Sequence, residues 1–132
     1  MKHLRILVAD DEPGIRSLIQ DALSLRGHNV TCAENGVEAL ALIASGPFDV
    51  LFLDIRMPKG DGLTALKEVR RIRPSMPVIM ITGCGKRETI DEALGLGSMA
   101  CLVKPFSMRD VVAMLDVVES MDCTDDLVES VE

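Results

Sequence analysis

Short apolar runs and amphipathic stretches alternate five times along the chain. The run at 50–53 is continuously apolar, and four further short runs rich in aliphatic residues occur elsewhere. Each run is followed by a stretch in which apolar residues recur every three or four positions, which is typical of one buried face of a helix. The pattern predicts five strand–helix units. The expected strands are 4–9, 28–33, 49–54, 77–82 and 100–104, and the expected helices are 13–27, 35–46, 62–74, 87–97 and 107–121.

Proline, glycine and asparagine mark the expected helix ends. Pro13 suits the first turn of the first helix, and Asn35 is a candidate N-cap for the second. Gly27 and Gly46 are candidate helix stops, and Pro74 ends the third helical pattern.

Strand–helix alternation with short connections favours parallel strands joined by crossover helices. Continuous apolar runs indicate strands that are covered on both faces. We therefore predict a doubly wound α/β domain, with a five-stranded parallel sheet between two helical layers. The last residues are acidic and have no strong pattern, so we expect them to fray or to extend the last helix weakly. The predicted division is a domain at 1–121 and an acidic tail at 122–132.

Composition narrows the class of protein. The 132 residues suffice for one domain, and the formal charge of −7 argues against direct nucleic-acid binding by this chain. No apolar stretch reaches the length of a membrane span, and the N-terminal run is too short for a signal peptide. The four cysteines are scattered, without zinc-site spacing, which is typical of free thiols in a reducing cytoplasm.

Charged and hydroxyl residues follow the predicted strands. Asp10 and Asp11 follow the first strand, Asp54 and Thr82 end the third and fourth, and Lys104 ends the fifth. In doubly wound sheets the carboxyl ends of the strands form the ligand-binding edge. We expect these side chains to meet there.

Clustered carboxylates repel one another, and Mg²⁺ relieves the repulsion through oxygen ligands. We predict Asp11 and Asp54 as direct ligands, together with the backbone carbonyl of Arg56, and Asp10 acting through water or by orienting the other ligands. Lys104 and a hydroxyl beside them suit phosphate oxygens, so the Asp54 carboxylate is a candidate nucleophile for phosphoryl transfer.

Four segments together resemble the receiver domain of two-component response regulators over about residues 4–120. They are "VADDE" at 8–12, "LDIRMPKGDG" at 53–62, "MITG" at 80–83 and "LVKPF" at 102–106. The resemblance implies a flavodoxin-like (βα)5 fold with strand order 2-1-3-4-5. It also implies that Asp54 accepts a phosphoryl group from a histidine kinase or phosphotransfer protein. Mg²⁺ would bind the acidic pair, Thr82 and Lys104 would contact the phosphoryl group, and the Lys104–Pro105 bond would be cis.

Some positions depart from that family's usual residues. A Tyr or Phe is usual three residues before the lysine, where this chain has Cys101. Since Cys101 is smaller, we expect a buried hydrophobic role for it, and movement of Thr82 and its loop to carry the signal. Arg56 and Cys84 occupy the positions that flank the phosphoryl group.

Three rival functions follow from the same residues. An Asp-nucleophile phosphohydrolase usually needs a second Asp two residues after the first, where this chain has Arg56. A flavodoxin-like cofactor binder needs a hydroxyl- and glycine-rich loop where this chain has "DDEPG" at 10–14. A pseudo-receiver that is never phosphorylated stays open because of Cys101. We expect no enzymatic turnover beyond self-phosphorylation and autodephosphorylation, in a stand-alone regulator or a piece of a longer protein.

The last helix has more apolar residues than one buried stripe needs. We assign the core stripe to Val111, Met114, Leu115 and Val118, and the surplus to Val112, Val117 and Met121. The surplus favours a phosphorylation-dependent homodimer or effector contact, with a wider buried stripe as the alternative.

Three further residues receive simple assignments. Glu12 suits the first turn of a helix as well as it suits a metal. His3 and His28 are expected to be surface residues without partners.

Overall fold

The computed structural model describes residues 3–57, 61–83 and 85–131, with side chains described as far as residue 120. One five-stranded parallel sheet has the order β2-β1-β3-β4-β5, which confirms the predicted fold and strand order. The strands are β1 (Arg5–Ala9), β2 (Asn29–Ala33), β3 (Val50–Asp54), β4 (Val78–Thr82) and β5 (Ala100–Val103). The helices are α1 (Pro13–Ser24), α2 (Gly36–Ser45), α3 (Gly62–Ile72), α4 (Arg87–Gly95) and α5 (Met108–Val131).

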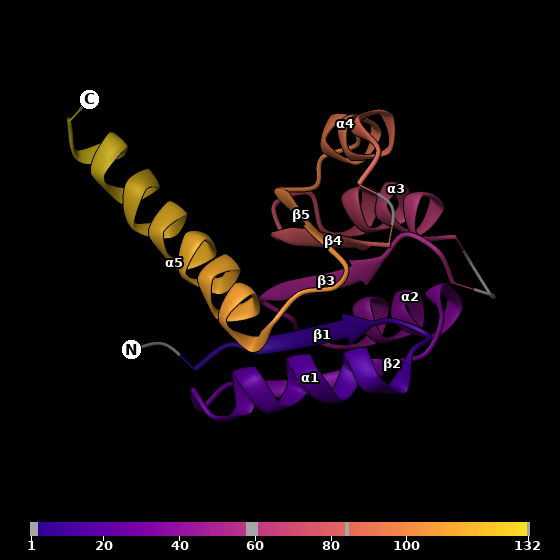
Figure 1. Cartoon of the computed structure of the whole chain (residues 1–132). Coiled ribbons are helices and arrows are strands. Elements are labelled where there is room, and N and C mark those ends of the chain that lie inside the picture. Colours follow the sequence, from indigo (N-terminus) through magenta and orange to yellow (C-terminus); the bar gives the residue numbers. More distant parts are fainter. Residues whose placement is uncertain (1–2, 58–60, 84, 132) are drawn as a thin grey trace.

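The sheet lies between two helical layers (Figure 1). Alternate residues of each strand face opposite layers, as the period of two requires. In β1, Ile6 and Val8 belong to the core that includes residues of α1 and α5, whereas Leu7 and Ala9 belong to the core that includes residues of α2, α3 and α4. Both cores are almost wholly aliphatic, and this two-sided burial explains the continuously apolar strands.

The predicted residues Asn35 and Gly27 lie at the ends of helices, as expected. The Asn35 side chain accepts a hydrogen bond of 2.8 Å from the Glu38 N–H, and Glu38 accepts one of 2.8 Å from the Glu34 N–H. These bonds satisfy backbone donors at the start of α2. Gly27 has φ +85° after α1, a left-handed conformation that glycine adopts without strain.

Helix α5 continues to Val131 and extends beyond the sheet (Figure 1). Val111, Leu115 and Val118 are buried, whereas Val117 is 47% exposed. Met114 and Val112 are partly buried against the same core. The predicted stripe is therefore confirmed with Met114 at its edge. The side chain of Met121 lies outside the described residues, and the division at residue 121 stays a prediction.

The expectation that His3 and His28 lack partners is wrong. His3 Nδ1 donates a hydrogen bond of 2.7 Å to the Gly27 carbonyl, and His28 Nδ1 accepts one of 3.1 Å from the Leu4 N–H. The His28 side chain is only 5% exposed, and burial lowers its pKa. The reason is tertiary: the α1–β2 connection folds back over the start of β1, which no local pattern reveals.

Gly62, the first residue of α3, lies directly against the backbone at the end of β3. Its N–H donates a 2.9 Å hydrogen bond to the Ile55 carbonyl. A Cβ at this position would overlap the Asp54 carbonyl oxygen and lie 2.6 Å from the Ile55 Cα. We expect Gly62→Ala to lower the free energy of unfolding by about 3 kcal/mol or more, because backbone cannot move aside cheaply. Urea unfolding followed by circular dichroism measures this.

Gly14→Ala is the matched control, since a Cβ there meets nothing within 4 Å. Gly14 lies inside α1, so alanine should leave stability unchanged or raise it by up to about 1 kcal/mol. Equal effects of the two substitutions would contradict this account of Gly62.

Candidate functional site

The strand register brings two aspartates together. Ala9 of β1 pairs with Leu53 of β3, so the next residues, Asp10 and Asp54, lie side by side at the carboxyl ends of neighbouring strands. Both are buried, at 0% and 2% exposure. The predicted convergence of these two residues is confirmed.

The next two strands complete the same edge. Thr82 ends β4 with 3% exposure and pairs with Val103 of β5. The Lys104 N–H donates a 2.7 Å hydrogen bond to the Thr82 carbonyl, which places the lysine just beyond β5. The Lys104–Pro105 bond is cis, as predicted.

The Lys104 ammonium lies among three carboxylates. Its Nζ is 2.6 Å from Glu12 Oε1, 3.3 Å from Asp10 Oδ2 and 3.5 Å from Asp54 Oδ2. The lysine side chain is 15% exposed and Glu12 is 57% exposed. The shortest ion pair therefore joins the ammonium to the most exposed of the three acids.

Burial makes these carboxylates hard to ionise together. Burial raises the pKa of Asp54 to about 7, and the charge of Asp10 adds to the shift against the opposing effect of Lys104. Burial also raises the pKa of Asp10, although a hydrogen bond from the Glu12 N–H and the Lys104 charge oppose this. Neighbouring acids with raised pKa values are typical of a site that binds a cation.

The pKa of Lys104 is raised too, and in a lysine this favours the charged form. Burial alone would lower its pKa, but the hydrogen bond to Glu12 and the charges of Asp54 and Asp10 raise the pKa above its ordinary value. The lysine is therefore charged throughout the physiological pH range.

The acidic residues fit a hard divalent cation. Within the part of the chain that the structure describes, Asp10 Oδ2 is buried without a hydrogen-bond partner, although it lies in ion-pair range of Lys104. Carboxylate oxygens of Asp10, Asp11 and Glu12 lie within 4.8 Å of one another. All of them are oxygen ligands, which Mg²⁺ prefers.

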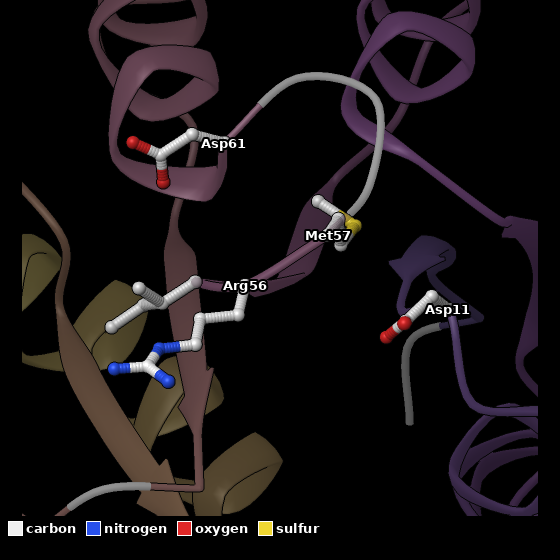
Figure 2. Close-up of a pocket in the computed structure, with 5 residues that line it drawn as sticks. Asp11, Arg56, Met57 and Asp61 are labelled. Carbon is white, nitrogen blue, oxygen red and sulfur yellow. The ribbon is translucent and has the colours of Figure 1, made fainter.

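A pocket of about 470 Å³ adjoins the acids and is lined by Asp11, Ile55, Arg56, Met57 and Asp61. Figure 2 shows the Asp11 carboxylate pointing toward the segment that carries Arg56 and Met57, while the Arg56 guanidinium turns away from Asp11. The predicted ligand Asp11 and the residue whose carbonyl was predicted as a ligand thus line one pocket. Their coordination of a metal stays a prediction.

Cys101 and Cys84 are two of the positions at which the sequence departs from the usual residues of receiver domains. Cys101 is partly buried against the core on the α2–α4 side, and burial raises the pKa of its thiol, in keeping with a hydrophobic role. Cys84 lies outside the described residues.

Glu12 is the site residue whose role sequence reasoning missed. It precedes α1, but its side chain makes no capping hydrogen bond and instead pairs with Lys104. The two residues are 92 positions apart, so only the tertiary fold reveals the pair.

Comparison with known proteins identifies the class. Residues 6–116 match the family model of the response regulator receiver domain. The chain belongs to this family, whose role is phosphorylation-dependent signalling in two-component systems. Phosphorylation on aspartate, Mg²⁺ binding at an acidic pocket and interaction with histidine kinases are general features of the family.

Individual relatives cover different shares of their own chains. Regulatory protein AtoC from Escherichia coli (strain K12) is 42% identical over 107 residues, which are 81% of this chain and 23% of AtoC. Response regulator MprA from Mycobacterium avium (strain 104) is 34% identical over 131 residues, which are 97% of this chain and 56% of MprA. The chain thus spans between about a quarter and just over half of these curated relatives.

Solved structures agree with this assignment. NtrX from Brucella abortus has a TM-score of 0.90 at 32% identity, covering 99% of this chain and 30% of NtrX. A CheY-like receiver domain protein from Methanospirillum hungatei JF-1 has a TM-score of 0.84 at 30% identity, covering 95% of this chain and 98% of that one. Among the described residues, no helix is long and apolar enough to cross a membrane.

The raised pKa of Asp54 predicts a pH dependence of stability in metal-free protein. Its folded-state pKa of about 7 lies above the ordinary value of 3.8, so between these values the folded state binds more protons than the unfolded state. The free energy of unfolding should therefore fall as pH rises through this window, by an Asp54 contribution on the order of 2–4 kcal/mol. Urea unfolding at a series of pH values with a chelator measures the slope.

Asp54→Asn should remove most of this slope, leaving the smaller share due to Asp10. Asp21→Asn, an exposed change on α1, should keep it. If Asp54→Asn and wild type show the same slope, the proposed electrostatic environment of Asp54 is wrong.

Proposed function

We propose that this chain accepts a phosphoryl group on Asp54 from a histidine kinase or phosphotransfer protein and thereby changes its affinity for a partner. The observation that carries this is the buried Asp54 carboxylate, with Lys104 Nζ 3.5 Å from its Oδ2 and Asp10 beside it. A carboxylate at a strand end without these neighbours would not support the proposal. The neighbours give it the surroundings that phosphoryl transfer needs.

The proposed step is a displacement at phosphorus. A carboxylate oxygen of Asp54 attacks the phosphorus of a phosphohistidine and forms an acyl phosphate. The phosphorus–nitrogen bond breaks, and its electron pair stays on the imidazole nitrogen, which then takes a proton. Only the ionised form of Asp54 can attack phosphorus. With a pKa of about 7, Asp54 of the metal-free protein is only partly ionised near neutral pH.

The surrounding residues have separate proposed roles. Lys104 stabilises negative charge on the phosphoryl oxygens, and Thr82 presents a hydroxyl at the end of the neighbouring strand. Asp10, Asp11, Asp54 and the Arg56 carbonyl would hold Mg²⁺, which when bound neutralises the carboxylates and the transferring group. With that charge neutralised, Asp54 and the neighbouring Asp10 could both be ionised.

We propose that loop movement at Thr82 carries the signal, since Cys101 lacks the volume of an aromatic ring. The chain would catalyse its own phosphorylation and autodephosphorylation, with no other turnover. Arg56 has no acid–base function, which disfavours a phosphohydrolase. The described cysteines, Cys32 and Cys101, are free thiols, which supports a reducing cytoplasm.

The phosphoacceptor is tested by intact-mass spectrometry after incubation with a small acyl phosphate and Mg²⁺. We expect one added phosphoryl group on wild type, none on Asp54→Ala and none when Mg²⁺ is chelated. Lys104→Met should slow adduct formation by about ten-fold or more, because it removes a charge that faces the phosphoryl oxygens.

Asp49→Asn is the control, since Asp49 precedes the same strand but pairs with Arg5 at the opposite edge of the sheet. It should acquire the adduct at the wild-type rate. An adduct that persists in Asp54→Ala would move the phosphoacceptor to another residue, and no adduct on wild type would favour a pseudo-receiver.

Helix α5 is the proposed contact for a second copy or an effector. Val117 is 47% exposed on this helix. We expect beryllium fluoride, a stable phosphoryl mimic, to raise the molar mass of the Mg²⁺-bound protein in light scattering, and Val117→Lys to weaken this dimer by about ten-fold.

Val37→Lys is the matched control, because Val37 is a 62% exposed apolar residue on α2, which packs on the opposite face of the sheet from α5. It should leave the dimer intact. A monomer at every concentration, with and without the mimic, would exclude the homodimer and leave an effector contact.

A further inference from the structure

Glu12 occupies an unusual place at the start of α1. Its backbone N–H donates a 2.8 Å hydrogen bond to Asp10 Oδ1, so the main chain is held against the buried acid. Its side chain makes no hydrogen bond to the helix it precedes and instead accepts a 2.6 Å hydrogen bond from Lys104 Nζ. The first-turn role expected for an acid at this position is therefore replaced by a contact with the lysine.

The surroundings of the ammonium show what this contact does. An ammonium has three N–H donors, and Lys104 has three carboxylates within 3.5 Å. Asp10 and Asp54 are buried, and both belong to the proposed Mg²⁺ and phosphoryl site. Glu12 is the exposed partner and makes the shortest contact.

Lys104 and Mg²⁺ are therefore rivals for the same two buried acids. When a cation binds there, the ammonium must give up at least part of its contact with Asp10 and Asp54, since like charges repel. Glu12 offers the displaced ammonium an acceptor at the rim, since the contact of 2.6 Å with Glu12 leaves Lys104 Nζ 3.5 Å from Asp54 Oδ2.

We propose that Glu12 is a positioning residue for Lys104: it draws the ammonium toward the rim and so lets Mg²⁺ compete successfully for Asp10 and Asp54. The inference deepens the proposed function and rests on it. The alternative role of Glu12 is direct metal ligation, since its carboxylate lies within 4.8 Å of those of Asp10 and Asp11. A positioning role for Glu12 needs Lys104, whereas direct metal ligation by Glu12 does not.

A double-mutant cycle separates the two roles. Mg²⁺ is titrated as its chloride into the full chain by isothermal titration calorimetry, at constant ionic strength, for wild type, Glu12→Gln, Lys104→Met and the double variant. We expect Glu12→Gln to weaken Mg²⁺ binding in the presence of Lys104, and to weaken it at least about three-fold less in the Lys104→Met background. The ratio of interest is the factor by which Glu12→Gln weakens Mg²⁺ binding with Lys104 present, divided by the same factor in the Lys104→Met background. The through-space effect of losing the Glu12 charge on Mg²⁺ cancels in this ratio.

A ratio of one overturns the proposal, whether Glu12→Gln weakens binding equally in both backgrounds, as a ligand would, or has no effect in either. A failure of wild type and Lys104→Met to bind Mg²⁺ overturns it as well. Asp21→Asn, which removes an exposed charge from the same helix, should show a ratio of one in its own cycle with Lys104→Met.

Failure of the proposed function has a different signature. If the Mg²⁺ cycle shows the coupling but no phosphoryl adduct forms on Asp54, then Glu12 positions Lys104 at a metal site that does not serve phosphoryl transfer. If the adduct forms and the ratio is one, the proposed function stands and only the role of Glu12 is wrong.

Discussion

The structure of the site depends on one unfavourable juxtaposition, the burial of Asp10 and Asp54 side by side at the carboxyl edge of the sheet. Burial raises the pKa of Asp54 to about 7, and repulsion from the neighbouring Asp10 carboxylate adds to this shift. Lys104 relieves part of this repulsion. A divalent cation would relieve more of it, and a phosphoryl group would then give the ammonium a new acceptor. The same charges that oppose ionisation of both carboxylates favour the binding of Mg²⁺ and of a phosphoryl group at this edge.

The fold holds this juxtaposition in place through backbone constraints. Parallel pairing of β1 with β3 fixes the two aspartates in register, and pairing of β4 with β5 brings Thr82 and Lys104 to the same edge. Gly62 allows α3 to begin directly against the backbone of Asp54 and Ile55. Because these contacts are made by main chain, the backbone positions of Asp10 and Asp54 cannot move apart without disturbing the sheet. The repulsion between the two carboxylates is thus a consequence of the fold. The fold also preorganises the reacting groups.

Most of the fold followed from the sequence, because strong periodic signals and local caps agreed with it. Continuous apolar runs predicted doubly covered strands, and Asn35 predicted the start of α2. The strand-end residues predicted the composition of the site, since the topology of a doubly wound sheet brings those ends together. Contacts between distant segments carried no such signal. The partners of His3 and His28, and the pairing of Glu12 with Lys104, depend on how connections fold over strand ends, and sequence periodicity contains no information on that.

The most direct test of this account is the titration of the Asp54 carboxyl group itself, followed by its carbon-13 chemical shift in protein labelled at the aspartate side chains and assigned with Asp54→Asn. In metal-free protein the Asp54 carboxyl group should titrate near pH 7, because it is buried beside Asp10. Saturating Mg²⁺ should move that titration well below its metal-free value, because the bound cation favours the ionised form. Titration near the ordinary value of 3.8 in the metal-free protein, with no change on adding Mg²⁺, would contradict the claim that crowded buried charge prepares Asp54 for its function.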